Sequence, residues 1–314
     1  MINNTVICLL PRLTIALLLL LAMPLQATNV TTSHRLEEAE TAYFYRDYEK
    51  VTDILVHLKS NIELNQQQHL EAQLLTIATQ IQQDKDDAED WLENFLAQHS
   101  HNAKAQYFGG LLWLKIAHDA SFFSKMSYFK RYVKAITNAA QLAPNNPRYQ
   151  FEAARAFGQS SMMGGDAKKQ KPIVDKLMPE NGTFAQIAMM DYLQNTQNEK
   201  ASIEIINRVS TEFNTDIEVL ERAAQLLRTL QKDPQARTLF TRACHLPPGI
   251  KEAFVKWSDA CLLSGVLSLQ SNENLKIGLA AIERLLRFTV VQDEETKFAM
   301  SIKSQLSNKL ADLH

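Results

Sequence analysis

The side chains best suited to chemistry in this sequence are two arginines, Arg148 and Arg155, which lie seven residues apart. On an α-helix this spacing is close to two turns, so both guanidinium groups would lie on one face. Two such groups can hold a carboxylate through charge-assisted hydrogen bonds. The spacing predicts a site for an acidic group or a peptide C-terminus, although for either arginine alone a solvated or packing role is the simpler interpretation.

Motifs for catalysis or metal binding are missing from the sequence. It contains no Gly-x-Ser-x-Gly, His-Glu-x-x-His or Gly-Lys-Ser/Thr motif. His99 and His101 flank Ser100, but no cysteine or third histidine lies near enough in sequence to complete a zinc site. The Gly164-Gly165-Asp166 segment is more typical of a turn into a helix than of an anion-binding loop. We therefore expect no catalytic residue, no metal and no cofactor.

The composition is that of an ordinary globular protein. The 314 residues are 46% hydrophobic and 22% charged, with a formal net charge of −2. Near-neutral charge argues against nucleic acid as a partner, even though the segment 129–134 mixes aromatic and basic residues. Only nine glycines occur, and this scarcity favours helices over turns and sheets.

The N-terminus has the features of a secretory signal peptide. Arg12 precedes an apolar run at residues 13–23, and Ala27 offers a cleavage point. The run is about half the length that a spanning helix needs, so no stable span is expected after cleavage. Cys8 precedes the run, which disfavours a lipoprotein. We expect a signal peptide at 1–27, a flexible start at 28–33, and export to a bacterial periplasm or, second, secretion.

Export would leave Cys244 and Cys261 in an oxidising compartment, where a disulfide can form. In a simple helical hairpin, however, these two residues would be separated along the axis by roughly 10–15 Å. That distance exceeds what a disulfide spans. The spacing favours two buried free thiols and leaves the disulfide open.

Apolar residues recur at helical spacing from residue 34 onward, which predicts a chain of amphipathic helices. Residues 120–132 are rich in aromatic side chains and are expected to form either an insertion or an extended second helix of a pair. The expected helices cover residues 36–45, 51–58, 67–83, 103–118, 120–132, 166–177, 183–194, 198–213, 217–230, 234–245, 251–263, 272–288 and 294–313. Two more are expected, one that begins in the acidic segment 84–90 and carries Trp91 and Phe95, and one that follows Pro147 and carries Phe151 and Phe157.

The order and spacing of these helices resemble the tetratricopeptide repeat family, whose unit is two antiparallel helices of about 34 residues. The signature of the second helix occurs as Ala236, Phe240, Ala243 and Pro248. Further signs are Pro144 and Pro179, 35 residues apart, and the turn Arg46-Asp47-Tyr48. The segment that ends at Gly164-Gly165-Asp166 is similar to a subgroup of exported bacterial proteins of this family, with a Gly-Gly-Asp turn before the second helix.

The resemblance implies an all-α, right-handed solenoid of about seven hairpins at residues 34–290, with a C-terminal capping helix at 291–314. In the family, the first helix of each hairpin lines a concave wall that binds a protein or peptide partner. The corresponding wall residues here are Gln106, Trp113, Arg148, Phe151, Arg155, Met189, Tyr192, Glu221, Gln225 and Arg228. The implied protein is a non-enzymatic periplasmic scaffold or transport accessory in an envelope assembly, transport or secretion process.

Two other functions remain open. Trp113 and the aromatic segment 122–132 could shape a pocket for a small molecule or lipid cargo that is passed to a membrane transporter. An enclosed apolar cavity would favour that function, and an open groove would favour the scaffold. An enzyme with an unrecognised site would require several strongly perturbed titratable groups in one cleft.

Overall fold

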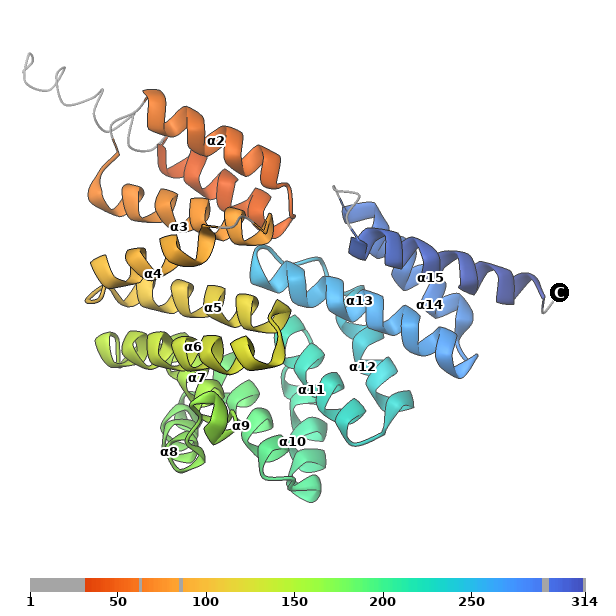
Figure 1. Ribbon diagram of the computed structural model, residues 1–314. Coiled ribbons are helices and arrows are strands. Elements are labelled where there is room, and N and C mark those ends of the chain that lie inside the picture. The colour runs from red at the N-terminus through yellow and green to blue at the C-terminus, as the bar shows by residue number, and fades with distance from the viewer. Residues whose placement is uncertain (1–31, 62–63, 85–86, 290–293, 313–314) are drawn as a thin grey trace, which may run out of the picture.

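The computed structural model describes residues 32–61, 64–84, 87–289 and 294–312, and within these ranges the fold is helical, without strands (Figure 1). The predicted signal peptide and residues 28–31 lie outside the described residues. Residues 32 and 33 of the predicted flexible start belong to a helix that extends to residue 44.

Seven helical hairpins follow one another along the described chain, and one helix remains at the end. The hairpins are residues 32–44 with α2 (Tyr48–Asn61), α3 (Gln66–Gln82) with α4 (Ala88–Gln98), α5 (Ala103–Asp119) with α6 (Phe122–Leu142), α7 (Pro147–Phe157) with α8 (Ala167–Leu177), α9 (Thr183–Asn195) with α10 (Glu199–Glu212), α11 (Ile217–Thr229) with α12 (Asp233–His245), and α13 (Glu252–Ser271) with α14 (Leu275–Phe288). The last helix is α15 (Glu294–Ala311), and short 3-10 turns occur at η1 (Ser161–Met163) and η2 (Met178–Glu180). The predicted solenoid of about seven hairpins with a terminal helix is confirmed.

The hairpins lie side by side in a curved row. In Figure 1 the row descends from α2 through α6, turns at α7–α10 and rises again to α13–α15. Buried apolar side chains form successive clusters along this row, so that each hairpin packs on the next. A single hairpin cannot bury its apolar face alone, and stacking is what stabilises it.

Local sequence sets the ends of the helices around α7 and α8. The side chain of Asn146 accepts hydrogen bonds from the backbone N–H groups of Arg148 and Tyr149 at the start of α7. Pro147 occupies the first turn, where its missing N–H has no consequence. The side chain of Asp166 likewise accepts from the N–H of Lys168 and starts α8.

The two glycines before Asp166 are both required by the shape of this turn. Gly164 has a φ of 90°, in the left-handed region that L side chains disfavour. A Cβ atom on Gly165 would lie 1.8 Å from the carbonyl oxygen of Gln159. The segment is therefore the turn into a helix that the sequence indicates.

The aromatic segment at 120–132 is not an insertion, because it belongs to the continuous helix α6. Phe129 and Tyr132 are buried, and Trp113 of α5, also buried, stacks on Tyr128. These side chains hold α5 against α6. Only the start of the segment leaves its aromatic side chains exposed, at Phe122 and its neighbour.

The expectation of free thiols is wrong, because Cys244 and Cys261 form a disulfide with their Cα atoms 4.7 Å apart. The connection between α12 and α13 is the reason. Leu246 ends α12 in an extended conformation, and two prolines follow, so residues 246–251 carry the chain away from the helix end. Cys261 lies nine residues into α13, about 13 Å along it. Helix α13 thus starts well beyond the end of α12, and its middle passes Cys244.

Trp257 shows how α13 covers the end of α12. Its indole N–H donates to the carbonyl oxygens of Cys244 and Leu246, at 3.0 and 3.2 Å. The side chain is completely buried. The last carbonyl groups of α12, which lack helical partners, are thereby satisfied from the next hairpin.

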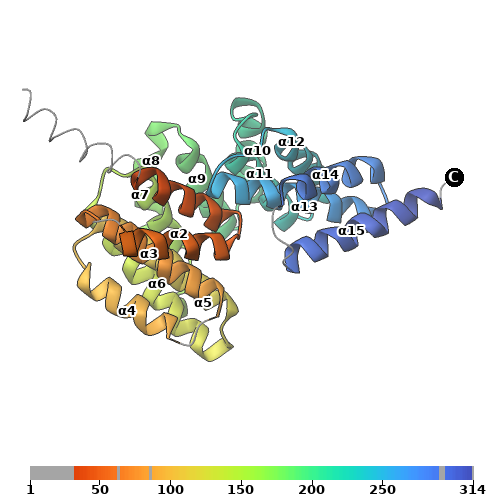
Figure 2. The same cartoon turned by 90° about the horizontal axis from the view of Figure 1, so that it is seen from above.

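The two ends of the row also touch (Figure 2). The ring of Tyr45 stacks on Phe254 of α13 with centroids 4.2 Å apart. Lys251, just before α13, forms an ion pair with Glu40 at 2.7 Å. Arg46 is paired with Glu295 of α15. The first hairpin therefore rests on the last hairpin and on the terminal helix, and the curved row is closed.

Candidate functional site

A polar cleft of about 440 Å³ lies on the inner side of the curve. It is formed by the first helices of four successive hairpins, α7, α9, α11 and α13, as the family resemblance implies. Its lining residues are Arg155, Gln159, Asp191, Gln194, Asn195, Glu221, Arg222, Gln225, Thr229, Lys256 and Asp259. We refer to this site as the polar cleft.

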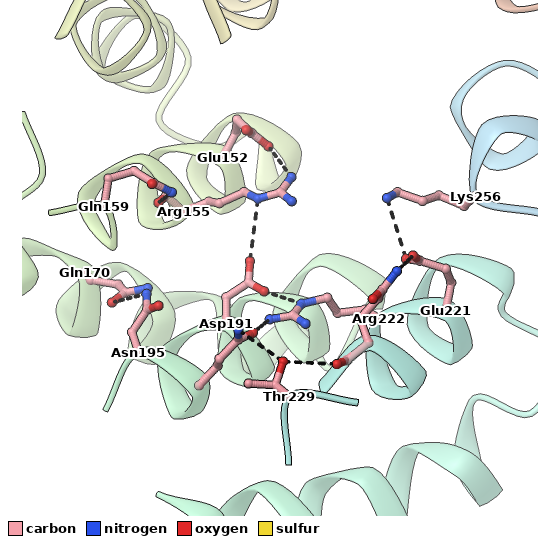
Figure 3. Close-up of polar contacts among 12 residues, drawn as sticks. Glu152, Arg155, Gln159, Gln170, Asp191, Asn195, Glu221, Arg222, Thr229 and Lys256 are labelled. Atoms are coloured by element: carbon pink, nitrogen blue, oxygen red, sulfur yellow. Dashed lines mark hydrogen bonds and ion pairs between the residues drawn. The ribbon is translucent and has the colours of Figure 1, made fainter. Parts of the chain in front are cut away.

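The centre of the polar cleft is a chain of ion pairs across three helices (Figure 3). Asp191 of α9 accepts a hydrogen bond from Arg222 of α11, which also donates to Gln194. The same aspartate faces Arg155 of α7, with its Oδ2 atom 3.9 Å from Nε. Asp191 is thus placed between two guanidinium groups and fixes the relative positions of α7, α9 and α11.

Among the side chains of this ion-pair network, that of Arg155 is the most accessible to a ligand. Its ion pairs with Glu152 and Asp191 are long, at 3.8 and 3.9 Å, and 43% of its side chain is exposed. The charge of Glu152, followed by that of Asp191, raises the pKa of Arg155 above its ordinary value. Arg155 therefore stays charged and retains N–H donors for an incoming acceptor.

Glu152, next to Arg155 in this network, is itself buried. Its Oε1 atom accepts a hydrogen bond of 2.7 Å from the hydroxyl of Tyr132 in α6. Burial, and then the charge of Glu152, raise the pKa of Tyr132 well above 10, so the hydroxyl remains a donor. The network thereby extends from the cleft into the core between α6 and α7.

The far side of the polar cleft is formed by α13. Lys256 lies 3.6 Å from a carboxylate oxygen of Glu221 and 4.0 Å from one of Asp259. Burial raises the pKa of Asp259 from 3.8 to about 6, opposed by Lys256 and Arg46 and assisted by Glu221 and Glu295. Asp259 therefore changes charge in mildly acidic solution.

We expect Asp259→Asn to stabilise the protein above about pH 6.5 and to lose this effect at about pH 3, below the unfolded pKa. Because the pKa of Asp259 is higher in the folded protein than in the unfolded chain, the folded protein binds this proton more tightly. In the wild type, the contribution of the protonated Asp259 to stability is complete below the unfolded pKa of 3.8 and is lost as the pH rises through about 6. Asparagine stays neutral, so the variant does not undergo this loss. Melting temperatures of variant and wild type across this range provide the measurement. Asp175→Asn, at an exposed pair with Lys171, is the control; an equal gain at every pH would contradict the assignment.

Carboxamide side chains complete the polar cleft, at Gln159, Gln194, Asn195 and Gln225. Their own hydrogen bonds include long ones: Gln194 to Thr229 at 3.4 Å, and Asn195 to Gln170 at 3.3 Å. A carboxamide both donates and accepts, as a peptide backbone does. The polar cleft thus combines charged groups with groups that match an extended main chain.

A second cleft, of about 430 Å³, lies on the same inner side near the N-terminal hairpins. Its floor is apolar and includes Leu36, Leu74, Leu75, Phe108, Leu111 and Leu112. Its rim is charged and largely paired, with Lys104 at 2.5 Å from Glu71 and Lys251 bound to Glu40. We refer to it as the apolar cleft.

The structure gathers three of the ten predicted wall residues, Arg155, Glu221 and Gln225, in the polar cleft. Gln106 is buried and donates to the carbonyl oxygens of Leu96 and His99, so it holds the end of α4. Trp113 is buried by its stack on α6. Neither of these two residues offers a surface to a partner.

The predicted arginine pair is divided between different partners. Arg148 donates to the hydroxyl of Tyr107 at 3.0 Å and lies 3.4 Å from Glu252 at the start of α13. Arg148 therefore joins α5, α7 and α13, whereas Arg155 faces the polar cleft. A carboxylate held by both, as their spacing indicates, would have to displace Glu252 from Arg148.

The other predicted wall residues lie outside the polar cleft. Phe151 is buried and Met189 is half-buried, and both pack in the core around α9. Tyr192 lines a separate hollow against α8, with Lys171 and others. Arg228 is half-buried, and its Nε atom has no hydrogen-bond partner.

The charged residues of the polar cleft missed by sequence reasoning are Asp191, Arg222, Lys256 and Asp259, and the uncharged ones are Gln159, Gln194, Asn195 and Thr229. A signal for Asp191 and Asp259 was present in the repeat length. Steps of 36, 34 and 34 residues lead from Arg155 to Asp191, then to Gln225 and then to Asp259. Equivalent positions of successive hairpins face the same side of a solenoid. Cleft-facing residues are therefore assigned more accurately by adding the repeat length to one known cleft residue than by counting from a small residue within each helix.

Within the part of the chain that the structure describes, no group of three or more histidine, cysteine or acidic side chains is arranged to hold a metal ion. Nor does any described helix have the length and apolar character needed to cross a bilayer.

The fold and the cleft define a class of protein: an α-solenoid of helical hairpins with a polar cleft on its inner side. Among solved structures, a tetratricopeptide repeat protein from Parabacteroides merdae ATCC 43184 is similar over 88% of this chain and 99% of its own, with 12% identity and a TM-score of 0.50. The TPR domain of P58(IPK) aligns over 90% of this chain and 80% of its own, with 13% identity and a TM-score of 0.27. No family model and no curated protein sequence matches.

The likeness to the Parabacteroides protein is one of fold. The chain thus has the tetratricopeptide repeat fold that its proline and alanine spacing predicts. Solenoids of this kind present extended concave surfaces to other proteins.

Proposed function

We propose that this protein is a non-enzymatic scaffold that binds an extended segment of a protein partner in its polar cleft. The observation that carries the proposal is that one cleft crosses α7, α9, α11 and α13 and is lined by carboxamide and charged side chains throughout. Four parallel helices at 8–10 Å spacing span about 25–30 Å, the length of about eight extended residues.

The chemistry of the polar cleft fits a main chain with a polar or acidic side chain. Gln194, Asn195 and Gln225 can pair with peptide N–H and C=O groups. Arg155 can hold a carboxylate because its present ion pairs are long. Bound segments would gain affinity as Asp259 becomes neutral, since repulsion of acidic groups is then reduced.

We further propose that the protein acts in a bacterial periplasm, in an envelope assembly, transport or secretion process. Two features support this location: the basic and apolar N-terminus of the sequence and the disulfide between Cys244 and Cys261. Disulfides persist in exported proteins and are rare in the cytosol.

Replacing Arg155 and Gln225 together by alanine is expected to reduce partner capture at least tenfold, because both side chains face the cleft and neither belongs to the core. The measurement is crosslinking and pull-down of the exported protein from its native envelope, with the recovered partner quantified by mass spectrometry. Because Arg155 also faces the buried Glu152, the melting temperature is measured in parallel, and capture is compared at a temperature at which both proteins are folded.

The matched control is Lys200→Ala with Gln235→Ala, which removes one cation and one carboxamide from exposed positions on α10 and α12. It should capture the partner as the wild type does. Unchanged capture by the Arg155 and Gln225 variant would reject the polar cleft as the binding site.

Binding of a small molecule or lipid cargo is the second candidate function, and the apolar cleft is the observation that favours it. A floor of leucine and phenylalanine side chains suits an acyl or aromatic group. Extraction of the purified protein with organic solvent would test this proposal, since a bound lipid would appear in the extract. Leu75→Glu, on the floor of the cleft, should abolish its recovery while leaving peptide capture intact.

A further inference from the structure

Helix α6 carries an exposed face that neither cleft uses. Over its 21 residues it has four basic side chains, Lys125, Lys130, Arg131 and Lys134, and no acidic one. The whole protein has a net charge of −2, so this concentration of positive charge is local. No residue of α6 lines the polar cleft or the apolar cleft.

Two adjacent phenylalanines begin the helix and are strongly exposed. Phe122 is 66% exposed and Phe123 is 81% exposed, and their rings touch edge to face at 5.7 Å. Water contact of two large apolar side chains at one helix end is costly. An exposed apolar pair beside positive charge indicates a surface that is covered in use.

The spacing places these features on one stripe. Lys130 and Lys134 follow Phe123 by seven and eleven residues, close to two and three helical turns, so the three side chains lie on one face. Both lysines are exposed, and neither ammonium group has an ion-pair or hydrogen-bonding partner among the described residues. Their charge is therefore available. We call Phe122, Phe123, Lys130 and Lys134 the α6 patch.

The turn before α8 extends the α6 patch. Gly164 lies beside Lys130, since a Cβ atom on this glycine would be 3.4 Å from the Lys130 side chain. Met162 in the same turn is 63% exposed, and Lys168 lies in the first turn of α8.

Acidic groups lie at the margins of the α6 patch: Asp119 is paired with Lys115 and Asp166 with Lys169 at 3.4 Å. On the side toward α4, Glu93 is paired with Arg131 at 3.1 Å and Glu89 accepts a hydrogen bond from the hydroxyl of Tyr128. The stripe from Phe123 to Lys134 is thus apolar at one end and positive at the other, while Arg131 beside it is neutralised by Glu93.

We propose that the α6 patch binds peripherally to an anionic bilayer surface. Phenylalanine side chains enter the boundary between headgroups and acyl chains, and lysines contact anionic headgroups, as at interfacial amphipathic helices. Each lysine near such a surface contributes about a fivefold gain in affinity at low salt. Because α6 is the second helix of its hairpin, the polar cleft stays open to a partner while the protein rests on the bilayer.

The test is co-sedimentation of the exported protein with vesicles of phosphatidylcholine alone or mixed equally with phosphatidylglycerol, at low ionic strength. The N-terminus is determined by mass spectrometry so that the apolar run at residues 13–23 is known to be absent. The wild type should bind the anionic vesicles at least tenfold more tightly than the neutral ones. Raising the salt concentration should weaken this binding.

Two double variants separate the contribution of the lysine charges to vesicle binding from that of the phenylalanine side chains. Lys130→Glu with Lys134→Glu should lower affinity for anionic vesicles at least 25-fold, on the order of a factor of five for each lost charge. Phe122→Ser with Phe123→Ser should lower it about tenfold, through loss of apolar insertion. In a separate Phe123→Trp variant, the tryptophan emission should shift to shorter wavelength only with anionic vesicles.

Matched controls change the same chemistry elsewhere. Lys200→Glu with Lys276→Glu reverses two exposed lysines on α10 and α14, and Ile250→Ser with Phe298→Ser removes two exposed apolar side chains. Each should bind within twofold of the wild type. The proposal is overturned if the wild type fails to bind anionic vesicles, if the controls lose as much affinity as the α6 variants, or if the α6 variants lose only a protein partner.

Discussion

A protein with Cys244→Ala and Cys261→Ala is expected to lose about 3 kcal/mol of unfolding free energy relative to the oxidised wild type. The two cysteines are 17 positions apart, and closing a loop of this size restricts the unfolded chain by about that amount. Both side chains are completely buried, so loss of the sulfur atoms adds a packing defect. Urea unfolding of the two proteins provides the measurement.

Reduction of the wild type is the matching experiment. The protein is unfolded, treated with a thiol reductant and refolded, and its free thiols are counted with a thiol reagent. Its unfolding midpoint should then fall toward that of the double variant, while the same treatment leaves the variant unchanged. A reduced wild type as stable as the oxidised protein would show that the disulfide makes no contribution to stability.

Gly165→Ala is expected to destabilise the protein by about 3 kcal/mol, because the new Cβ would lie 1.8 Å from the carbonyl oxygen of Gln159. That atom is backbone and cannot rotate away. The turn would have to open, which weakens the hydrogen bonds from Gly165 N–H to Ser160 and from Asp166 N–H to Phe157, at 3.0 and 2.9 Å. Thermal and urea unfolding would measure the loss.

Gly182→Ala is the control for this substitution. It also precedes a helix, but a Cβ at this position would meet no atom within 4 Å. We expect a loss below about 1 kcal/mol, mainly from the weaker helix-capping preference of alanine. Comparable losses for Gly165→Ala and Gly182→Ala would mean that general glycine effects, and not the close approach to Gln159, account for the result.

The fold could be predicted from sequence because the signals are local and repeated. Asn146 and Pro147 start a helix for reasons contained in a few residues. The closing prolines at Pro144, Pro179 and Pro248 repeat near the family length or twice that length. Errors in one hairpin do not alter the assignment of the next, since each contacts mainly its neighbours.

The disulfide could not be predicted, because it depends on the path of a loop. Residues 246–251 could return the chain at once or carry it outward, and their sequence does not decide between these paths. Only the structure shows that α13 starts far beyond α12, with Trp257 over the carbonyl groups at its end. A displacement of a few residues along a helix axis determines whether Cys261 meets Cys244.

The candidate site could be predicted only in part, for a similar reason. Helical spacing predicts which residues share a face of a helix. Which of these faces lines the cleft depends on how each helix is rotated relative to its neighbours, and the spacing does not determine this. Gln106 and Arg148 have the side chains of a binding wall, yet they hold α4, α5 and α13 in place. Asp191 and Arg222 reach the polar cleft because their helices are rotated toward it.

The stack formed by Tyr45 on Phe254, together with the pairs Lys251–Glu40 and Arg46–Glu295, has a consequence for cooperativity. In an open row of repeats, an outermost unit can fray without affecting distant units, because free energy is shared only between neighbours. Here the first and last units are neighbours as well. Substitutions that destabilise residues 32–61 should therefore also destabilise α13 and α15. The described hairpins are expected to unfold together as a ring, and not one after another from an outermost hairpin.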